Sequence, residues 1–95
     1  MVSMAIISIR HKGLKRLWTK GDSSKLEAHL VPKIVERLDI LDQASNLDEI
    51  AQFPELAFHP LNGVDRYSIK VDKNWRLTFE FDDGNVYILD YEDYH

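Results

Sequence analysis

The chain contains no cysteine in its 95 residues, so it can form neither a disulfide framework nor a thiolate metal site. It also lacks any apolar run near the roughly 20 residues that are needed to span a bilayer. The opening segment, residues 1–7, is too short for the apolar region of a signal peptide and has no cleavage pattern. From these absences we expect a cytoplasmic protein that does not associate with membranes.

The composition is that of one folded domain. Hydrophobic residues make up 44% of the chain and charged residues 29%, which is typical of a globular protein and not of a disordered one. No repeat, linker or low-complexity segment interrupts the sequence. We therefore expect a single domain over residues 1–95 with one hydrophobic core.

Charge is distributed unevenly along the chain, whose net charge is −4. Residues 1–20 hold five basic side chains and no acidic one, whereas residues 38–95 hold four basic and thirteen acidic side chains. This asymmetry predicts a local basic patch on an acidic body, although a solvated helix face explains the same pattern. The acidic half can equally be a docking surface for a basic protein partner.

The first half of the chain predicts one strand and two helices. The apolar, β-branched residues 5–10 favour a strand, and residues 12–19 favour a short basic helix that ends at Gly21. The capping-box spacing of Ser24 and Glu27 predicts a second helix that extends to about Ala44. Pro32 should kink or restart that helix, because proline cannot donate a backbone hydrogen bond. We read His29, on or near the apolar stripe of this helix, as a structural residue.

The second half predicts a helical turn at residues 47–51 and then four strands. Residues 56–61 form the first strand, which Pro60 places at a sheet edge or a strand end. After a turn at residues 62–65, residues 67–71 and 75–81 alternate apolar and polar side chains, so each strand should bury one face. An Asp-Gly turn at residues 82–85 leads to residues 86–89, whose continuous apolar character indicates a strand covered on both faces.

Taken together, these elements predict an α+β domain with the order β-α-α-β-β-β-β. Strands that follow one another through short turns form an antiparallel meander. The two N-terminal helices should pack on one face of that sheet and give a two-layer fold.

Four segments of the sequence resemble the HigB-type toxins of bacterial type II toxin–antitoxin systems, within the RelE/ParE superfamily. They are RHKGL at residues 10–14, FHPL at residues 58–61 with Gly63, NWR at residues 74–76 with Thr78 and Phe79, and YEDYH at residues 91–95. The resemblance implies the RelE/ParE-like fold and a ribosome-dependent endoribonuclease that cuts messenger RNA in the ribosomal A site. It also implies a helix-turn-helix antitoxin that neutralises the toxin and binds the operator DNA of the shared operon.

The same resemblance implies which residues form the site. The candidate catalytic residues are His59, Arg76, Asp93, Tyr94 and His95. Family members often carry a lysine where Asn62 stands here, and Arg66 can supply the missing charge from another direction. Candidate contacts to RNA or the ribosome are Arg10, Lys12, Lys15, Arg16, Asn62, Arg66 and Lys73.

The chemistry of these side chains suits RNA cleavage without a metal. One group must take the proton of the 2′-hydroxyl, a cation must stabilise the phosphorane oxygens, and an acid must protonate the leaving 5′-oxygen. Arg76 suits the second role because a guanidinium stays charged and binds phosphate oxygens in pairs. Histidine, tyrosine and aspartate at the other positions leave the acid and the base unassigned. No cofactor or metal site is expected, because no two of the four histidines form a close pair.

Two other functions remain open on the sequence alone. A RelE/ParE-fold binding module without nuclease activity would act as a gyrase-type inhibitor or as an inactive toxin bound by its antitoxin. An RNA-binding domain would instead use the basic residues of the first helix. The nuclease reading requires that His59, Arg76 and His95 meet at one solvent-open pocket.

Overall fold

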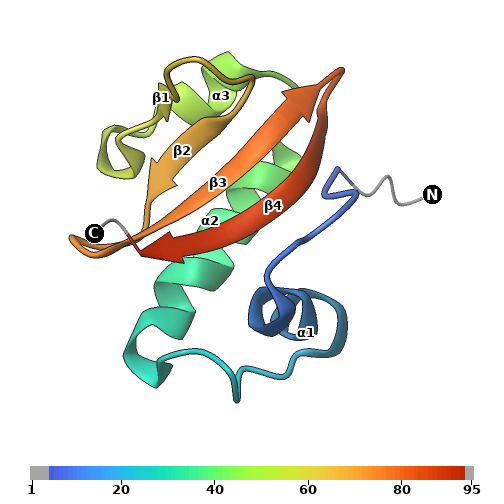
Figure 1. The fold of residues 1–95 in the computed structure, drawn as a ribbon, viewed down its shortest axis with the longest axis vertical. Coiled ribbons are helices and arrows are strands. Elements are labelled where there is room, and N and C mark those ends of the chain that lie inside the picture. The colour runs from blue at the N-terminus through green and yellow to red at the C-terminus, as the bar shows by residue number, and fades with distance from the viewer. Residues whose placement is uncertain (1–4, 94–95) are drawn as a thin grey trace.

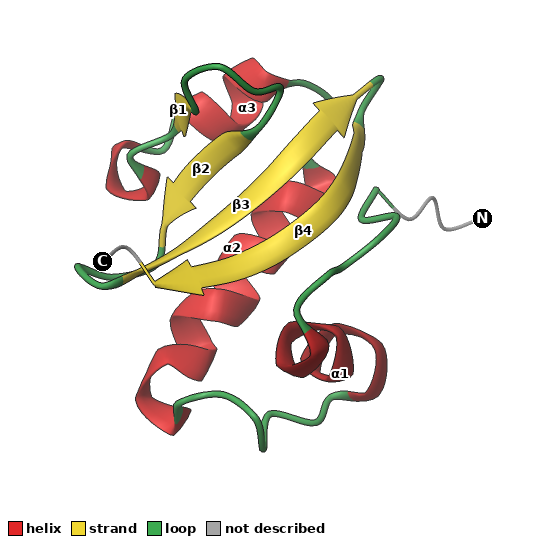
Figure 2. Ribbon diagram, in the orientation of Figure 1, coloured by secondary structure: helices red, strands yellow, loops and turns green. Residues whose placement is uncertain are grey.

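The computed structural model describes residues 5–93, which form three α-helices and a four-stranded antiparallel sheet (Figures 1 and 2). The helices are α1 (Lys12–Lys20), α2 (Val31–Gln43) and α3 (Leu47–Ala51). Single turns of 3-10 helix span Ala28–Leu30 and Pro54–Leu56. The strands are β1 (His59–Pro60), β2 (Tyr67–Lys70), β3 (Trp75–Asp82) and β4 (Asn85–Asp93).

The sheet is a meander whose spatial order is β1-β2-β3-β4. Each neighbouring pair is antiparallel, as the short turns between the strands predict. β1 lies at the edge of the sheet, where Pro60 was predicted to place it. The predicted strand over residues 56–61 is shorter than expected, because a 3-10 turn precedes it and Ala57 adopts a left-handed conformation with φ 47°.

The predicted first strand, residues 5–10, is not a regular strand. The segment runs parallel to β4 but makes only two isolated bridges, Ile6 to Val86 and Ile9 to Leu89. The ladder is interrupted because Ile88 has φ 50° and donates its N–H to the Ser8 hydroxyl, at 2.8 Å, instead of to a backbone carbonyl. Among the described residues the element order therefore begins with a helix and not with a strand.

The left-handed residue Ile88 forms a β-bulge in β4, and this bulge corrects the prediction that residues 86–89 are covered on both faces. Val86 and Leu89 are fully buried, whereas Tyr87 and Ile88 are only partly buried. The register shift between β3 and β4 falls between Thr78 and Glu80, directly opposite this stretch. Because a bulge bends its strand and breaks the alternation of faces, a continuous apolar sequence here does not mean two covered faces.

The second helix begins later than the capping-box spacing predicts. α2 starts at Val31 with Pro32 in its first turn, where the missing N–H of proline costs no helical hydrogen bond. Ser24 lies instead in a turn and donates its backbone N–H to the Asp22 carboxylate at 3.0 Å. The restart at Pro32 and the end at Ala44 are confirmed. His29 precedes the helix, is 72% exposed and faces Glu27 at 3.8 Å, so it is not a packing residue of the apolar stripe.

The core lies between the sheet and α2, which crosses behind β3 and β4 (Figure 1). Burying each large apolar side chain contributes about 1.5–3 kcal/mol. The residues with no exposed surface include Leu14 of α1, Ile34, Leu38 and Leu41 of α2, and Leu77, Phe79 and Leu89 of the sheet. The alternate positions of β2, β3 and β4 carry polar side chains on the opposite, helix-free face of the sheet. No helix within residues 5–93 is long and apolar enough to cross a membrane.

Candidate active site

A cleft of about 330 Å³ opens on the polar face of the sheet. Strand register brings its residues together, because His59 pairs with Ser68 across β1 and β2 and Lys70 pairs with Arg76 across β2 and β3. Residues that pair across strands share a face, and residues two apart on one strand do so as well. The cleft is lined by Ala57, His59, Ser68, Lys70, Lys73 and Arg76.

His59 and Arg76 are in contact within this cleft. The Nη1 atom of Arg76 lies 3.4 Å from Nε2 of His59, and Nδ1 of His59 lies 3.0 Å from the carbonyl oxygen of Ala57. A carbonyl only accepts hydrogen bonds, so Nδ1 must carry a proton and donate it to Ala57. In neutral His59 the lone pair is therefore on Nε2, which faces the guanidinium.

The cleft is cationic although the whole chain is acidic. Lys70, Lys73 and Arg76 line it together with His59, and none of its six lining residues is Asp or Glu. Lys73 is held there by the turn between β2 and β3, in which Asp72 accepts the backbone N–H groups of Asn74 and Trp75 at 2.9 and 2.8 Å.

Burial acts to raise the pKa of the Asp72 carboxyl, but these two N–H donors, together with the charges of Lys33 and His29, outweigh it. The pKa of Asp72 therefore lies below its ordinary value, and the turn is stabilised by an ionised carboxylate.

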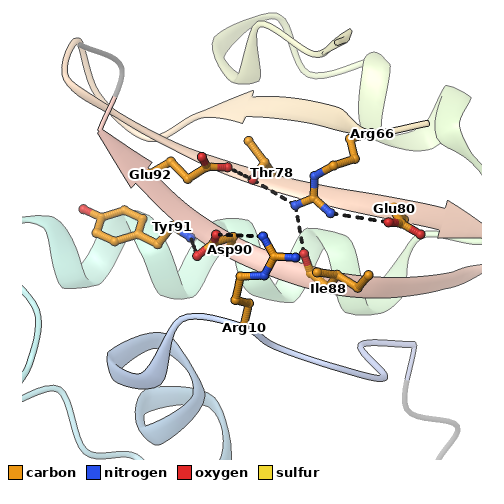
Figure 3. A network of polar contacts seen from close by, with 8 residues as sticks. All are labelled: Arg10, Arg66, Thr78, Glu80, Ile88, Asp90, Tyr91 and Glu92. Carbon is orange, nitrogen blue, oxygen red and sulfur yellow. Dashed lines mark hydrogen bonds and ion pairs between the residues drawn. The ribbon is translucent and has the colours of Figure 1, made fainter. Parts of the chain in front are cut away.

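A polar network occupies the same face beside the cleft (Figure 3). Arg66 donates from Nη2 to the Thr78 hydroxyl at 3.1 Å and to the Ile88 carbonyl at 2.9 Å, and its Nη1 lies 3.7 Å from Glu80. Thr78 in turn donates a hydrogen bond to Glu92, the register partner of Arg76. Arg66 was predicted as an RNA contact, but its side chain is only 17% exposed and is held within the protein.

The remaining candidate catalytic residues do not all lie at the cleft. Asp93 is exposed at the end of β4 and pairs with Trp75, so strand alternation places it on the face of the sheet opposite to Arg76. Tyr94 and His95 lie outside the described residues. The pocket that was predicted to join His59, Arg76 and His95 is therefore described for the first two residues only.

Beside Asp93, an aromatic cluster fills the helix-covered side of the sheet. Tyr91 is 6% exposed, stacks on Trp75 with 4.5 Å between ring centroids, and meets the edge of His11 at 5.5 Å. Its hydroxyl is buried and has no hydrogen-bond partner among the described residues. Burial, and then the nearby carboxylates of Glu27 and Asp72, raise the pKa of the Tyr91 phenol above its ordinary value.

The other predicted RNA contacts are dispersed over the surface. Lys12, Lys15 and Arg16 are exposed on α1, which lies beside β4 and far from β1 (Figure 1), and Arg16 forms an ion pair with Asp22 at 2.9 Å. Arg10 is 64% exposed and lies 3.9 Å from Asp90. Asn62 is exposed in the turn after β1. Of the predicted RNA contacts within residues 5–93, only Lys73 lines the cleft.

Two polar residues of the cleft, Ser68 and Lys70, were not predicted as site residues. They occupy the polar positions of β2, between the apolar Tyr67, Ile69 and Val71. This alternation, combined with the pairing of β2 and β3, is enough to predict that both side chains lie on the same face as Arg76. Residues 5–93 contain no group of three or more His, Asp or Glu side chains arranged to hold a metal ion.

Comparison with known proteins identifies the family. Residues 7–95 match the model of the RelE-like toxin of type II toxin–antitoxin system HigB. The chain is also 48% identical, over 94 residues, to the endoribonuclease HigB of Proteus vulgaris, and the match covers 95% of this chain and 99% of that protein. The chain belongs to the HigB family of RelE-like toxins of type II toxin–antitoxin systems.

Proposed function

We propose that this toxin is an endoribonuclease whose catalytic centre is the cleft between His59 and Arg76. The observation that carries the proposal is the 3.4 Å contact between these two side chains, in a cleft whose other charged lining residues are lysines. The name of the Proteus vulgaris relative, endoribonuclease HigB, supports the reaction class. A guanidinium beside an imidazole supplies a fixed cation and a group that exchanges protons near neutral pH.

In the proposed reaction the 2′-hydroxyl of RNA attacks the adjacent phosphorus. The bond from phosphorus to the 5′-oxygen breaks, and the products are a 2′,3′-cyclic phosphate and a free 5′-hydroxyl. Arg76 stabilises the negative charge that gathers on the phosphorane oxygens. His59 exchanges a proton through Nε2, because its Nδ1 is held by the Ala57 carbonyl. Tyr94 and His95 complete the site as further acid, base or base-stacking groups, and Asp93, which lies on the face opposite to Arg76, orients a histidine from outside the cleft.

The substrate in this proposal is messenger RNA on the ribosome. Lys70 and Lys73 bind the phosphate backbone at the cleft, while the exposed cations of α1 and Arg10 contact RNA or the ribosome beside the A site. Membership of a type II toxin–antitoxin family implies an antitoxin protein as the partner of this toxin. We propose that this antitoxin carries a helix-turn-helix and brings the complex to operator DNA.

Mapping the 5′ ends of cellular RNA after induction tests the proposal. The nuclease should arrest growth and produce new 5′ ends at codon-related positions, and Arg76→Ala should abolish both effects. Growth arrest with intact messages would support a binding module without nuclease activity, such as a gyrase-type inhibitor. Loss of function after reversal of the α1 charges, with Arg76→Ala fully active, would support an RNA-binding domain instead.

A further inference from the structure

Ser68 combines complete burial with a position on the wall of the cleft. Ser68 is only 1% exposed, and its Oγ atom has no hydrogen-bond partner among residues 5–93. The same side chain lines the cleft that His59 and Arg76 share. In the sheet it is paired with His59 on one side and with Thr78 on the other.

An unpaired buried hydroxyl is unfavourable for folding, because it loses its hydrogen bonds to water and gains none in the protein. Most buried polar atoms in native proteins have partners, so an exception calls for a physical reason. Thr78 shows the ordinary case one strand away, since it is 2% exposed and its hydroxyl contacts both Arg66 and Glu92. Ser68 has no such partner, yet it is on the wall of a cleft where a ligand can supply one.

The cleft determines which ligand fits. Ser68 is its only lining residue with a hydroxyl among those described, and its charged neighbours are Lys70, Lys73 and Arg76. These cations attract an anion, and a hydroxyl can donate a hydrogen bond to an anionic oxygen without adding charge. A phosphate group has enough acceptor oxygens to contact the guanidinium and the hydroxyl together.

We propose that Ser68 is a phosphate-binding residue of this site, whose Oγ donates a hydrogen bond to a non-bridging oxygen of the RNA phosphate that Arg76 also binds. The proposal rests on the assignment of RNA cleavage to this cleft. It gives the buried hydroxyl its missing partner when RNA is bound, and it predicts opposite effects of one substitution on stability and on activity.

Ser68→Ala tests the proposal through thermal unfolding of the free protein and single-turnover cleavage of ribosome-bound messenger RNA. Removing an unpaired hydroxyl should leave the melting temperature unchanged or raise it by up to about 8 °C. Cleavage should slow by roughly tenfold or more, because the loss of one hydrogen bond to a charged oxygen changes an equilibrium or rate by about that factor. Thr78→Val is the matched control for stability, because it removes a hydroxyl that has partners and should lower the melting temperature.

Two results would overturn the proposal. A lower melting temperature for Ser68→Ala would show that the hydroxyl already has a partner in the protein, and an unchanged cleavage rate would show that it does not contact the RNA. Arg76→Ala, measured in parallel, separates this failure from that of the site itself. If Arg76→Ala is inactive while Ser68→Ala cleaves normally, the site stands and only the role of Ser68 fails.

Discussion

The guanidinium of Arg76 and the imidazole of His59 meet at 3.4 Å, across a strand that separates β1 from β3. The contact joins His59, which is exposed on the two-residue edge strand β1, to Arg76, which is partly buried on the central strand β3. The carbonyl of Ala57 fixes the ring from its other side. His59 is thus oriented by two partners, and its Nε2 lone pair is held at the cationic cleft.

His59→Gln should reduce RNA cleavage by about 100-fold or more, the usual contribution of a positioned acid or base. An amide keeps the polarity of the position but does not exchange protons near neutral pH. The matched control is His29→Gln, because His29 is 72% exposed, lies before α2 and does not line the cleft. Single-turnover rates on ribosome-bound messenger RNA measure both variants, and equal rates for the two would remove His59 from the mechanism.

Arg66→Ala should destabilise the protein by about 2 kcal/mol, because it leaves the Ile88 carbonyl without its hydrogen-bond donor and the Glu80 carboxylate without its ion-pair partner. Arg10→Ala is the contrasting change: Arg10 is 64% exposed, and its pair with Asp90 spans 3.9 Å, so removing it should cost about 0–1 kcal/mol. Urea unfolding gives both values. A loss of RNA affinity at unchanged stability would show instead that Arg66 serves as a substrate contact.

Ile88→Gly should cost less stability than the same change at Ile9. Both isoleucines are partly buried, but Ile88 has φ 50°, a conformation that costs an L-residue about 1–2 kcal/mol and costs glycine little. Relief of this strain should offset part of the lost side-chain burial at residue 88 only. Equilibrium urea unfolding of the two variants measures the difference, and equal losses would contradict the strained bulge.

Tyr91→Phe should remove part of the alkaline sensitivity of the fold. The raised pKa of the Tyr91 phenol means that the folded state favours the neutral form. The contribution of the neutral Tyr91 phenol to the free energy of unfolding is complete below the ordinary pKa of about 10. It is lost as the pH rises from there toward the higher pKa of the folded state. The stability of the parent should therefore fall relative to Tyr91→Phe between about pH 9 and pH 11 in urea titrations. If the difference in unfolding free energy between the parent and Tyr91→Phe stayed constant over this pH range, the pKa of the phenol would not be raised by folding.

The sequence alone predicted the elements whose patterns are local. Alternation along residues 75–81 placed Arg76 on the polar face, and Pro32 marked the start of α2. Ser24 and Glu27 were misleading because a side-chain spacing cannot show whether the backbone continues as a helix, and here a turn and a 3-10 segment follow.

Features that depend on pairing between distant segments could not be predicted. The bulge at Ile88 arises where β4 meets both β3 and Ser8, so an apolar run gave no sign of it. Arg66 looked like a free cation in the sequence, because its partners on β3 and β4 lie 12 to 22 residues further along the chain. Ser68 lies at the site only because β2 is flanked by β1 and β3 in the folded sheet, and this order of strands is not visible in the sequence around Ser68.

Cleavage of RNA in the cleft at Arg76 can be measured as the rate at which the protein cuts messenger RNA on purified ribosomes. Arg76→Ala is compared with Lys33→Ala, which removes an exposed cation from α2 on the other side of the sheet. We predict that Arg76→Ala cleaves at least 100-fold more slowly than the parent, whereas Lys33→Ala cleaves at the parental rate. Cleavage at the parental rate by a folded Arg76→Ala protein would show that RNA is not cut in this cleft.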